Sequence, residues 1–146
     1  MNVFLICMLC ALVWGIAPIF EKISLQHTSS FVALTIRSIA TSIVLITISF
    51  AMGKHTEIIS VDSKSLLFIL VGGFFGILGL FLYFVALKQA DASRVVPLVN
   101  VFPLFTAFYS VALLGEKLTV SKWVGIAFVI TGIILLNQQS FRSHVE

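Results

Sequence analysis

The feature that most constrains this chain is a series of long apolar stretches that are almost free of charge. A transmembrane helix needs roughly 17–25 predominantly apolar residues to cross the roughly 30 Å hydrocarbon core of a bilayer. The sequence contains five candidate stretches, interrupted by short polar connections. They cover residues 3–20, 31–52, 65–87, 95–115 and 123–137. The pattern therefore predicts five membrane-spanning helices.

The overall composition agrees with a lipid environment. Hydrophobic residues make up 60% of the 146 residues and charged residues only 10%, and the mean hydropathy is +1.15. Soluble domains carry about 25% charged residues, so this chain has too few polar groups to cover a globule in water. The short connections leave no room for a soluble domain. We expect one all-α, polytopic membrane domain over residues 1–146, in the cell (inner) membrane.

Several function classes are disfavoured by the residues themselves. The net charge is +3, but the nine Lys and Arg residues are scattered singly, so no nucleic-acid partner is expected. Cys7 and Cys10 are three residues apart, and no further Cys or His pair completes a metal site. We also find no nucleophile–base pair and no phosphate-binding loop. The sequence predicts a protein that is not an enzyme and needs no cofactor or metal.

Arg37 lies inside the second apolar stretch, seven residues after Ser30, or about 10 Å along a helix axis. Its guanidinium is always charged, and near the bilayer centre it would cost at least about 2.5–3.5 kcal/mol. Such a residue either reaches back to the interface or lines a polar path inside the protein. Both readings remain open, and we favour the path.

The stretch "VVPLVNVFPLF", residues 95–105, combines two prolines with an asparagine. On one continuous helix, Pro97, Asn100 and Pro103 fall within about a 120° arc. Each proline frees a backbone carbonyl, and lipid satisfies neither these carbonyls nor the Asn100 amide. We therefore expect a kinked helix whose polar face lines a transport path. A kinked helix that only packs against its neighbours is the competing interpretation.

The first and third stretches hold three further candidates for the path. Trp14 is near the middle of the first stretch and is expected to face other helices or a cavity. Lys22 follows Glu21 where the apolar run stops, which by default is a solvated helix end. A functional role for the two becomes plausible if the helix continues to Ser24 or Leu25. The Tyr83 hydroxyl either donates to a ligand or marks the interface.

Glycines in the third and fifth stretches have spacings typical of helix packing in lipid, where small residues let backbones approach closely. We expect them to pack helices within or between subunits, rather than to contact a ligand. They are Gly72, Gly73, Gly76, Gly79, Gly125 and Gly132.

The distribution of Lys and Arg predicts no preferred orientation in the membrane. Five crossings place the termini on opposite sides. The N-terminal side then carries Lys54, Lys64, Lys117 and Lys122, and the other side carries Lys22, Lys88, Arg94 and Arg142, with Arg37 added if it reaches that interface. Because a Lys/Arg excess normally sets topology, its absence favours insertion in both orientations and an antiparallel pair of copies. That arrangement is typical of transporters built from inverted repeats.

Residues 81–136 resemble the C-terminal three-helix part of EamA domains, in the drug/metabolite transporter superfamily. The resemblance rests on "YFVALK", "ASRVVPL", "PLFTA", "LLGE" with a following Trp-x-Gly, and "TGIILL". "WGIAPIFEK" and "TIRS" resemble the family's first and second helices. The resemblance implies one five-helix unit, half of an inverted-repeat transporter fold. It also implies that cavity-lining positions fall on Trp14, Lys22, Arg37, Tyr83, Pro97, Asn100 and Pro103.

These expectations converge on a transporter of small metabolites, acting in efflux as a homodimer by alternating access. The alternatives are an accessory or structural membrane subunit and a component of a lipid-linked sugar translocator. The related small multidrug resistance pumps use a glutamate in the middle of their first helix, where this chain has "CALVWGI". Proton-coupled export of cations is therefore disfavoured. Arg37 and Lys22 would instead suit a substrate with a carboxylate or phosphate.

Overall fold

The computed structural model describes residues 2–142, and side chains as far as residue 136. Over this range the chain is helical, without strands. The helices are α1 (Val3–Leu25), α2 (Ser30–Ala51), α3 (His55–Ile59), α4 (Ser63–Gln89), α5 (Ala92–Val99), α6 (Phe102–Leu114) and α7 (Val120–Arg142). The chain divides into two compact units, the first ending at Gln89 and the second beginning at Ala90. Each unit is described by itself.

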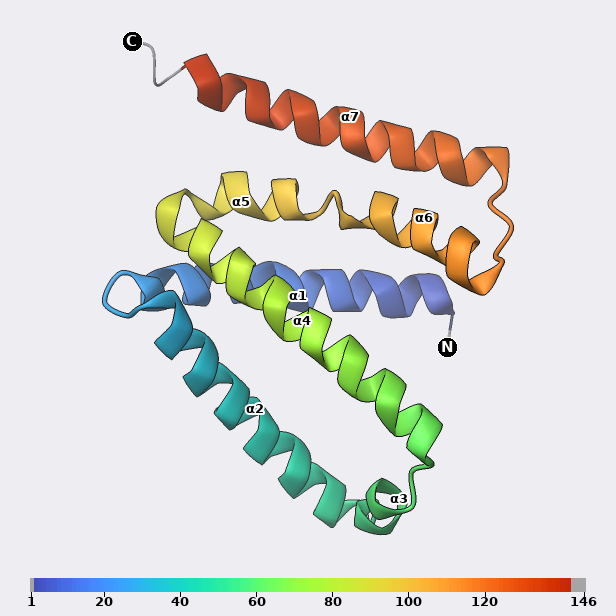
Figure 1. Ribbon diagram of the computed structural model, residues 1–146. Helices are drawn as coiled ribbons and strands as arrows, with labels where there is room; N and C mark the ends of the chain where they lie inside the picture. The colour runs from blue at the N-terminus through green and yellow to red at the C-terminus, as the bar shows by residue number, and fades with distance from the viewer. Residues whose placement is uncertain (1, 143–146) are drawn as a thin grey trace. The chain divides into compact units, whose positions relative to one another are not determined.

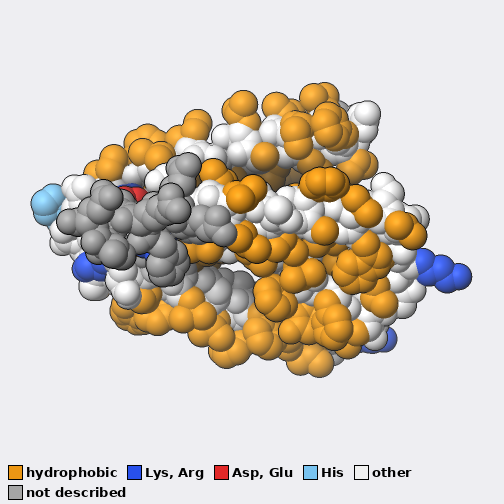
Figure 2. All heavy atoms as spheres, turned by 90° about the horizontal axis from the view of Figure 1, so that it is seen from above, with side chains coloured by type: hydrophobic (Ala, Val, Ile, Leu, Met, Phe, Trp, Pro, Cys, Tyr) orange, Lys and Arg blue, Asp and Glu red, His pale blue; other side chains and the backbone are white. Residues whose placement is uncertain are grey.

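Four helical segments are long and apolar enough to cross a membrane, judged by length and composition over the described residues. They are α1, α2, α4 and the α5–α6 segment Ala92–Leu114. The fifth predicted crossing corresponds to a shorter apolar helix, Val120–Leu136 within α7, so the count of five stays a prediction. Hydrophobic side chains cover most of the described surface on the face drawn in Figure 2. The protein is a multi-pass membrane protein.

The first predicted helix is longer than expected. We predicted an end at residue 20, and α1 continues to Leu25. The apolar run is therefore a poor guide to this helix end, because hydropathy reports where lipid contact stops, whereas the helix ends where its backbone bonds stop. Glu21 and Lys22 consequently lie in the last turns of a regular helix, and their side chains are half-buried.

The segment predicted as one kinked helix over 95–115 remains one candidate crossing, Ala92–Leu114, but is divided into α5 and α6. A turn at Asn100 and Val101 separates the two helices, and Val101 keeps right-handed helical dihedral angles. Pro97 and Pro103 lack the N–H groups that would bind the carbonyls of the residues four positions earlier. Pro103 stands at the second position of α6, where a missing N–H is tolerated. The turn therefore stands directly before Pro103, whereas α5 continues past Pro97 to Val99.

Local caps account for other helix ends. The Ser29 hydroxyl accepts the Val32 N–H at 3.3 Å and caps α2. The Asp62 carboxylate accepts the Ser65 N–H at 2.9 Å ahead of α4. Hydrogen bonds from Ser65 hold the pKa of Asp62 below its usual value. Gly115, with φ of 67°, adopts the left-handed conformation that ends α6.

In the first unit, α2 and α4 run in opposite directions and are joined by α3, while α1 crosses them near the opposite end (Figure 1). The buried side chains gather where α1 ends, α2 begins and α4 ends: Leu25, Leu34, Phe84 and Leu87. The middle of α4 has no such packing. A Cβ atom added at any of its four glycines would meet nothing within 4 Å.

Side-chain donors reinforce this packed end of the first unit. The Lys22 amine donates to the Leu87 carbonyl at 2.8 Å, and the Lys88 amine donates to the Thr28 carbonyl at 2.9 Å. The Ser30 hydroxyl donates to the Phe84 carbonyl at 3.2 Å. The last four carbonyls of a helix have no partner within the helix, and Leu87 is one of them. These bonds therefore tie the end of α4 to α1 and to the start of α2.

In the second unit, α7 returns alongside α5 (Figure 1). Its buried residues are one from each helix, Val95 of α5, Ala107 of α6 and Ile133 of α7. Gly125 and Gly132 of α7 have open space where a side chain would begin. The prediction that the glycines pack helices together therefore finds no partner surface among the described residues, and packing between copies stays a prediction.

Candidate functional site

The first unit contains a cleft of about 420 Å³ between α1, α2 and α4, which we call the charged cleft. Most of its lining is apolar, with Glu21 and Arg37 as its two charged residues. It is lined by Ala17, Phe20, Glu21, Ser24, Thr28, Ala33, Ile36, Arg37 and Phe84. Because α1 continues to Leu25, its last turns reach the level of Arg37 on α2 and bring the two opposite charges together.

Glu21 and Arg37 form an ion pair across the cleft. The Arg37 Nε lies 3.5 Å from the Glu21 Oε1. The Glu21 side chain is 12% exposed and the Arg37 side chain is 43% exposed. The guanidinium carbon also lies 5.9 Å from the centre of the Phe84 ring, within the range of a cation–π contact. The pair explains how an arginine is tolerated inside an apolar helix, since an opposite charge replaces part of its lost hydration.

Two other predicted residues border this pair without lining the cleft. The Tyr83 hydroxyl on α4 interacts with the Glu21 carboxylate. The Lys22 amine is bound to the Leu87 carbonyl, so its charge is directed at the end of α4. Trp14 is 70% exposed and is not among the residues that line the charged cleft.

Glu21 was not among our predicted site residues. Its sequence position, at the end of an apolar run and beside Lys22, is typical of a solvated helix end. The sequence indicated a role for Glu21 only if the first helix continues to Ser24 or Leu25, and α1 does continue that far. Only the packing of α1 against α2 shows that Arg37 is its partner.

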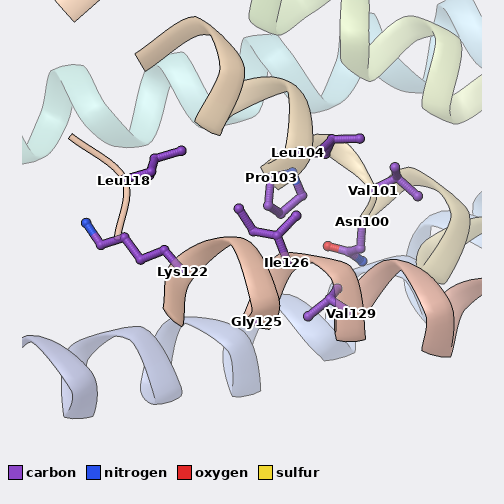
Figure 3. A pocket seen from close by; sticks show the side chains of 9 residues that line it. All are labelled: Asn100, Val101, Pro103, Leu104, Leu118, Lys122, Gly125, Ile126 and Val129. Carbon is purple, nitrogen blue, oxygen red and sulfur yellow. The ribbon is translucent and has the colours of Figure 1, made fainter. Parts of the chain in front are cut away.

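The second unit contains a cleft of about 330 Å³ between α6, its preceding turn and α7, which we call the Asn100 cleft. Figure 3 shows Pro103 and Ile126 facing each other across it, with Asn100 at one end. Lys122 lies toward the other end, and its amine points away from Asn100. The remaining lining residues are Val101, Leu104, Leu118, Gly125 and Val129.

Asn100 donates two hydrogen bonds to one backbone carbonyl of α5. Its Nδ2 donates to the Val96 carbonyl at 2.7 Å, and the same carbonyl accepts the Asn100 N–H at 3.1 Å. Pro103 also lines the Asn100 cleft, but Pro97 does not. The shared arc of Pro97, Asn100 and Pro103 stays a prediction, since α5 ends at Val99 and Pro103 belongs to α6.

Five of the seven predicted path residues fall into two groups, and Trp14 and Pro97 line neither cleft. Arg37 lines the charged cleft, with Tyr83 and Lys22 at its border, and Asn100 and Pro103 line the cleft of the second unit. Among the described residues no group of three or more His, Cys, Asp or Glu side chains is placed to hold a metal ion. The chemistry that these clefts offer is ionic and hydrogen-bonding contact with a ligand.

Helices long and apolar enough to cross a membrane, with an ion pair in a cleft between them, define a multi-pass membrane protein. The chain belongs to the EamA-like transporter family, which it matches over residues 1–138. The resemblance inferred from the sequence motifs is confirmed.

The chain is also similar to individual proteins. The chain is 31% identical over 122 residues to a Sinorhizobium protein named as an uncharacterized transporter in the cobO 3′ region, covering 84% of this chain and 86% of that protein. It is 31% identical over 130 residues to an uncharacterized protein of Methanocaldococcus jannaschii, covering 89% and 92%. Human solute carrier family 35 member F6 is 38% identical over 58 residues, which are 40% of this chain and 16% of that protein. No solved structure matches the chain.

Proposed function

We propose that this protein moves a small metabolite out of the cell across the cell (inner) membrane, as one half of a transporter that works by alternating access. The observation that carries the proposal is the Glu21–Arg37 pair, which lies in a cleft within a chain of a transporter family. Charged side chains inside membrane helices are costly and commonly mark substrate paths.

A homodimer is the proposed working form. Transporters built from inverted repeats place the substrate site between the two repeats, and this chain supplies one family domain. The glycines of α4 have open space around them, where another helix could approach closely. The near-equal Lys and Arg counts on the two sides favour an antiparallel pair.

Transport itself is tested in two stages on the full chain. A thermal-shift screen of the detergent-purified protein against a metabolite library is expected to give ligands that raise the melting temperature, because a ligand that binds the folded form stabilises it. Each hit is then assayed by counterflow in proteoliposomes, with empty liposomes as the control. We expect saturable counterflow of at least one hit. Hits that bind but never exchange across the bilayer would contradict the proposal and favour an accessory subunit.

The antiparallel arrangement is tested separately in cells. Copies fused at the C-terminus to a reporter active only in the cytoplasm, or to one active only outside it, are expected to give comparable signals from both. Adding two lysines to the α3 connection should bias the Lys/Arg balance and shift the population toward one orientation. A single active reporter for the unmodified chain rules out dual insertion and leaves a parallel dimer.

A further inference from the structure

The Glu21–Arg37 contact is made through the Nε of the guanidinium, one of its three nitrogen atoms. The ion pair joins the Arg37 Nε to the Glu21 Oε1 at 3.5 Å, which is long for a charge-assisted hydrogen bond of about 2.7–2.9 Å. Arginine carries five N–H donors in a planar fork that matches a carboxylate in a two-bond arrangement. The guanidinium also lies against the Phe84 ring, which holds it in the charged cleft.

The accessible member of the pair is the cation. The Arg37 side chain is 43% exposed, whereas the Glu21 side chain is 12% exposed and is backed by the Tyr83 hydroxyl. A ligand entering the charged cleft therefore meets the guanidinium first. The Tyr83 hydroxyl is the donor next to Glu21 that a carboxylate displaced from Arg37 would meet. This asymmetry favours an anionic ligand over a cationic one.

The remaining lining limits the kind of anion. Arg37 supplies the single cation among the residues that line the cleft, so one ligand carboxylate in place of Glu21 matches it better than the nearly double charge of a phosphate monoester. Ala17, Phe20, Ala33 and Ile36 give the cleft an apolar wall, which suits a ligand with an apolar body. Its volume, about 420 Å³, is within the range of small-molecule sites.

We propose that the charged cleft binds a small water-soluble monocarboxylate with an apolar body, whose carboxylate displaces Glu21 from Arg37. Glu21 then acts as a tethered competitor that occupies Arg37 when the site is empty. This inference rests on the proposed transport function, since it names the substrate class of that function. Its consequence is that neutralising the two members of the pair has opposite effects on binding.

The test measures binding to the full chain in a non-ionic detergent, with phenylacetate as the probe. Phenylacetamide is the neutral control of the same shape, and phenethylamine, inorganic phosphate and oleate are the other probes. We expect saturable binding of phenylacetate that is at least about tenfold tighter than that of the amide, because bonds to charged groups contribute about 1.5–3 kcal/mol. Arg37→Gln should weaken phenylacetate binding at least about tenfold, whereas Glu21→Gln should strengthen it about tenfold.

Charge-matched controls are available outside the cleft. Lys64→Gln and Glu57→Gln make the same changes in net charge at exposed positions and should leave binding within about twofold, because distant exposed charges are screened. If Arg37→Gln fails to fold, Glu21→Gln still decides, because unchanged or weaker phenylacetate binding in that variant overturns the proposal. Tighter binding of phenethylamine, of phosphate, or of oleate alone also overturns it.

The same experiments separate this inference from the proposed function. Counterflow of some other ligand, with no carboxylate binding, would sink the monocarboxylate site and leave the transporter standing. Saturable phenylacetate binding without counterflow of any ligand would support the monocarboxylate site and contradict the transport function.

Discussion

Phe84→Ala is expected to lower the free energy of unfolding of the detergent-purified protein by about 3 kcal/mol, at the lower end of the range for buried aromatic residues. Phe84 is 1% exposed and lies among the few buried side chains of the first unit. In lipid or detergent the loss comes from van der Waals packing more than from exclusion of water. The removed ring also ends the contact with the Arg37 guanidinium. Thermal or denaturant unfolding of both proteins measures the difference.

Phe74 provides the matched control on the same helix, since its side chain is 65% exposed. Phe74→Ala should change the free energy of unfolding by less than about 0.5 kcal/mol, as is usual for exposed substitutions. Equal losses from the two variants would mean that the packed end of the first unit does not stabilise the protein more than the open face of α4.

Arg37→Gln is expected to destabilise the protein more than Glu21→Gln does. Removing Arg37 leaves a carboxylate that is 12% exposed without its partner, whereas removing Glu21 leaves a guanidinium that is 43% exposed and can reach water. Breaking a fully buried pair costs about 3–5 kcal/mol. The partial exposure of Arg37 reduces this through solvent screening, so we expect about 1–2 kcal/mol for Arg37→Gln.

A double-mutant cycle separates the pair from its surroundings. The variant with both substitutions should be more stable than the sum of the single losses predicts, by at least about 0.5 kcal/mol. Strict additivity would show that the two side chains do not interact in the folded protein. Lys64→Gln, which removes an exposed cation from the start of α4, is the control and should be close to neutral.

The site could be predicted only in part from the sequence, and Arg37 shows why. An arginine within an apolar helix is a strong signal by itself, because the cost of its charge does not depend on the fold. For Lys22, by contrast, the role of the charge depends on the fold. Its role depends on the Leu87 carbonyl, 65 residues away, and no local pattern predicts that contact. The same holds for Glu21, whose partner lies on another helix.

The turn between α5 and α6 could also be predicted only in part from the sequence. The prolines predicted a disturbed helix at residues 97 and 103, and the turn does stand directly before Pro103, but α5 continues past Pro97 to Val99. At the turn Val101 keeps right-handed helical angles, whereas Asn100 departs from them with ψ of 11°. The Asn100 side chain and its backbone N–H both donate to the Val96 carbonyl, a local contact that the proline positions alone do not predict.

By itself the sequence determined that lipid surrounds this chain, which segments are apolar enough to cross it, that the chain belongs to a transporter family, and that Arg37 requires an explanation. These properties follow from residue type and local order, because transfer free energies and helix breakers act at single positions. Only the tertiary structure decided that Arg37 faces Glu21 in a cleft, that Lys22 holds the end of α4, and that the proline-rich segment forms two helices. Those outcomes depend on distances between helices, which the order of residues along the chain does not specify.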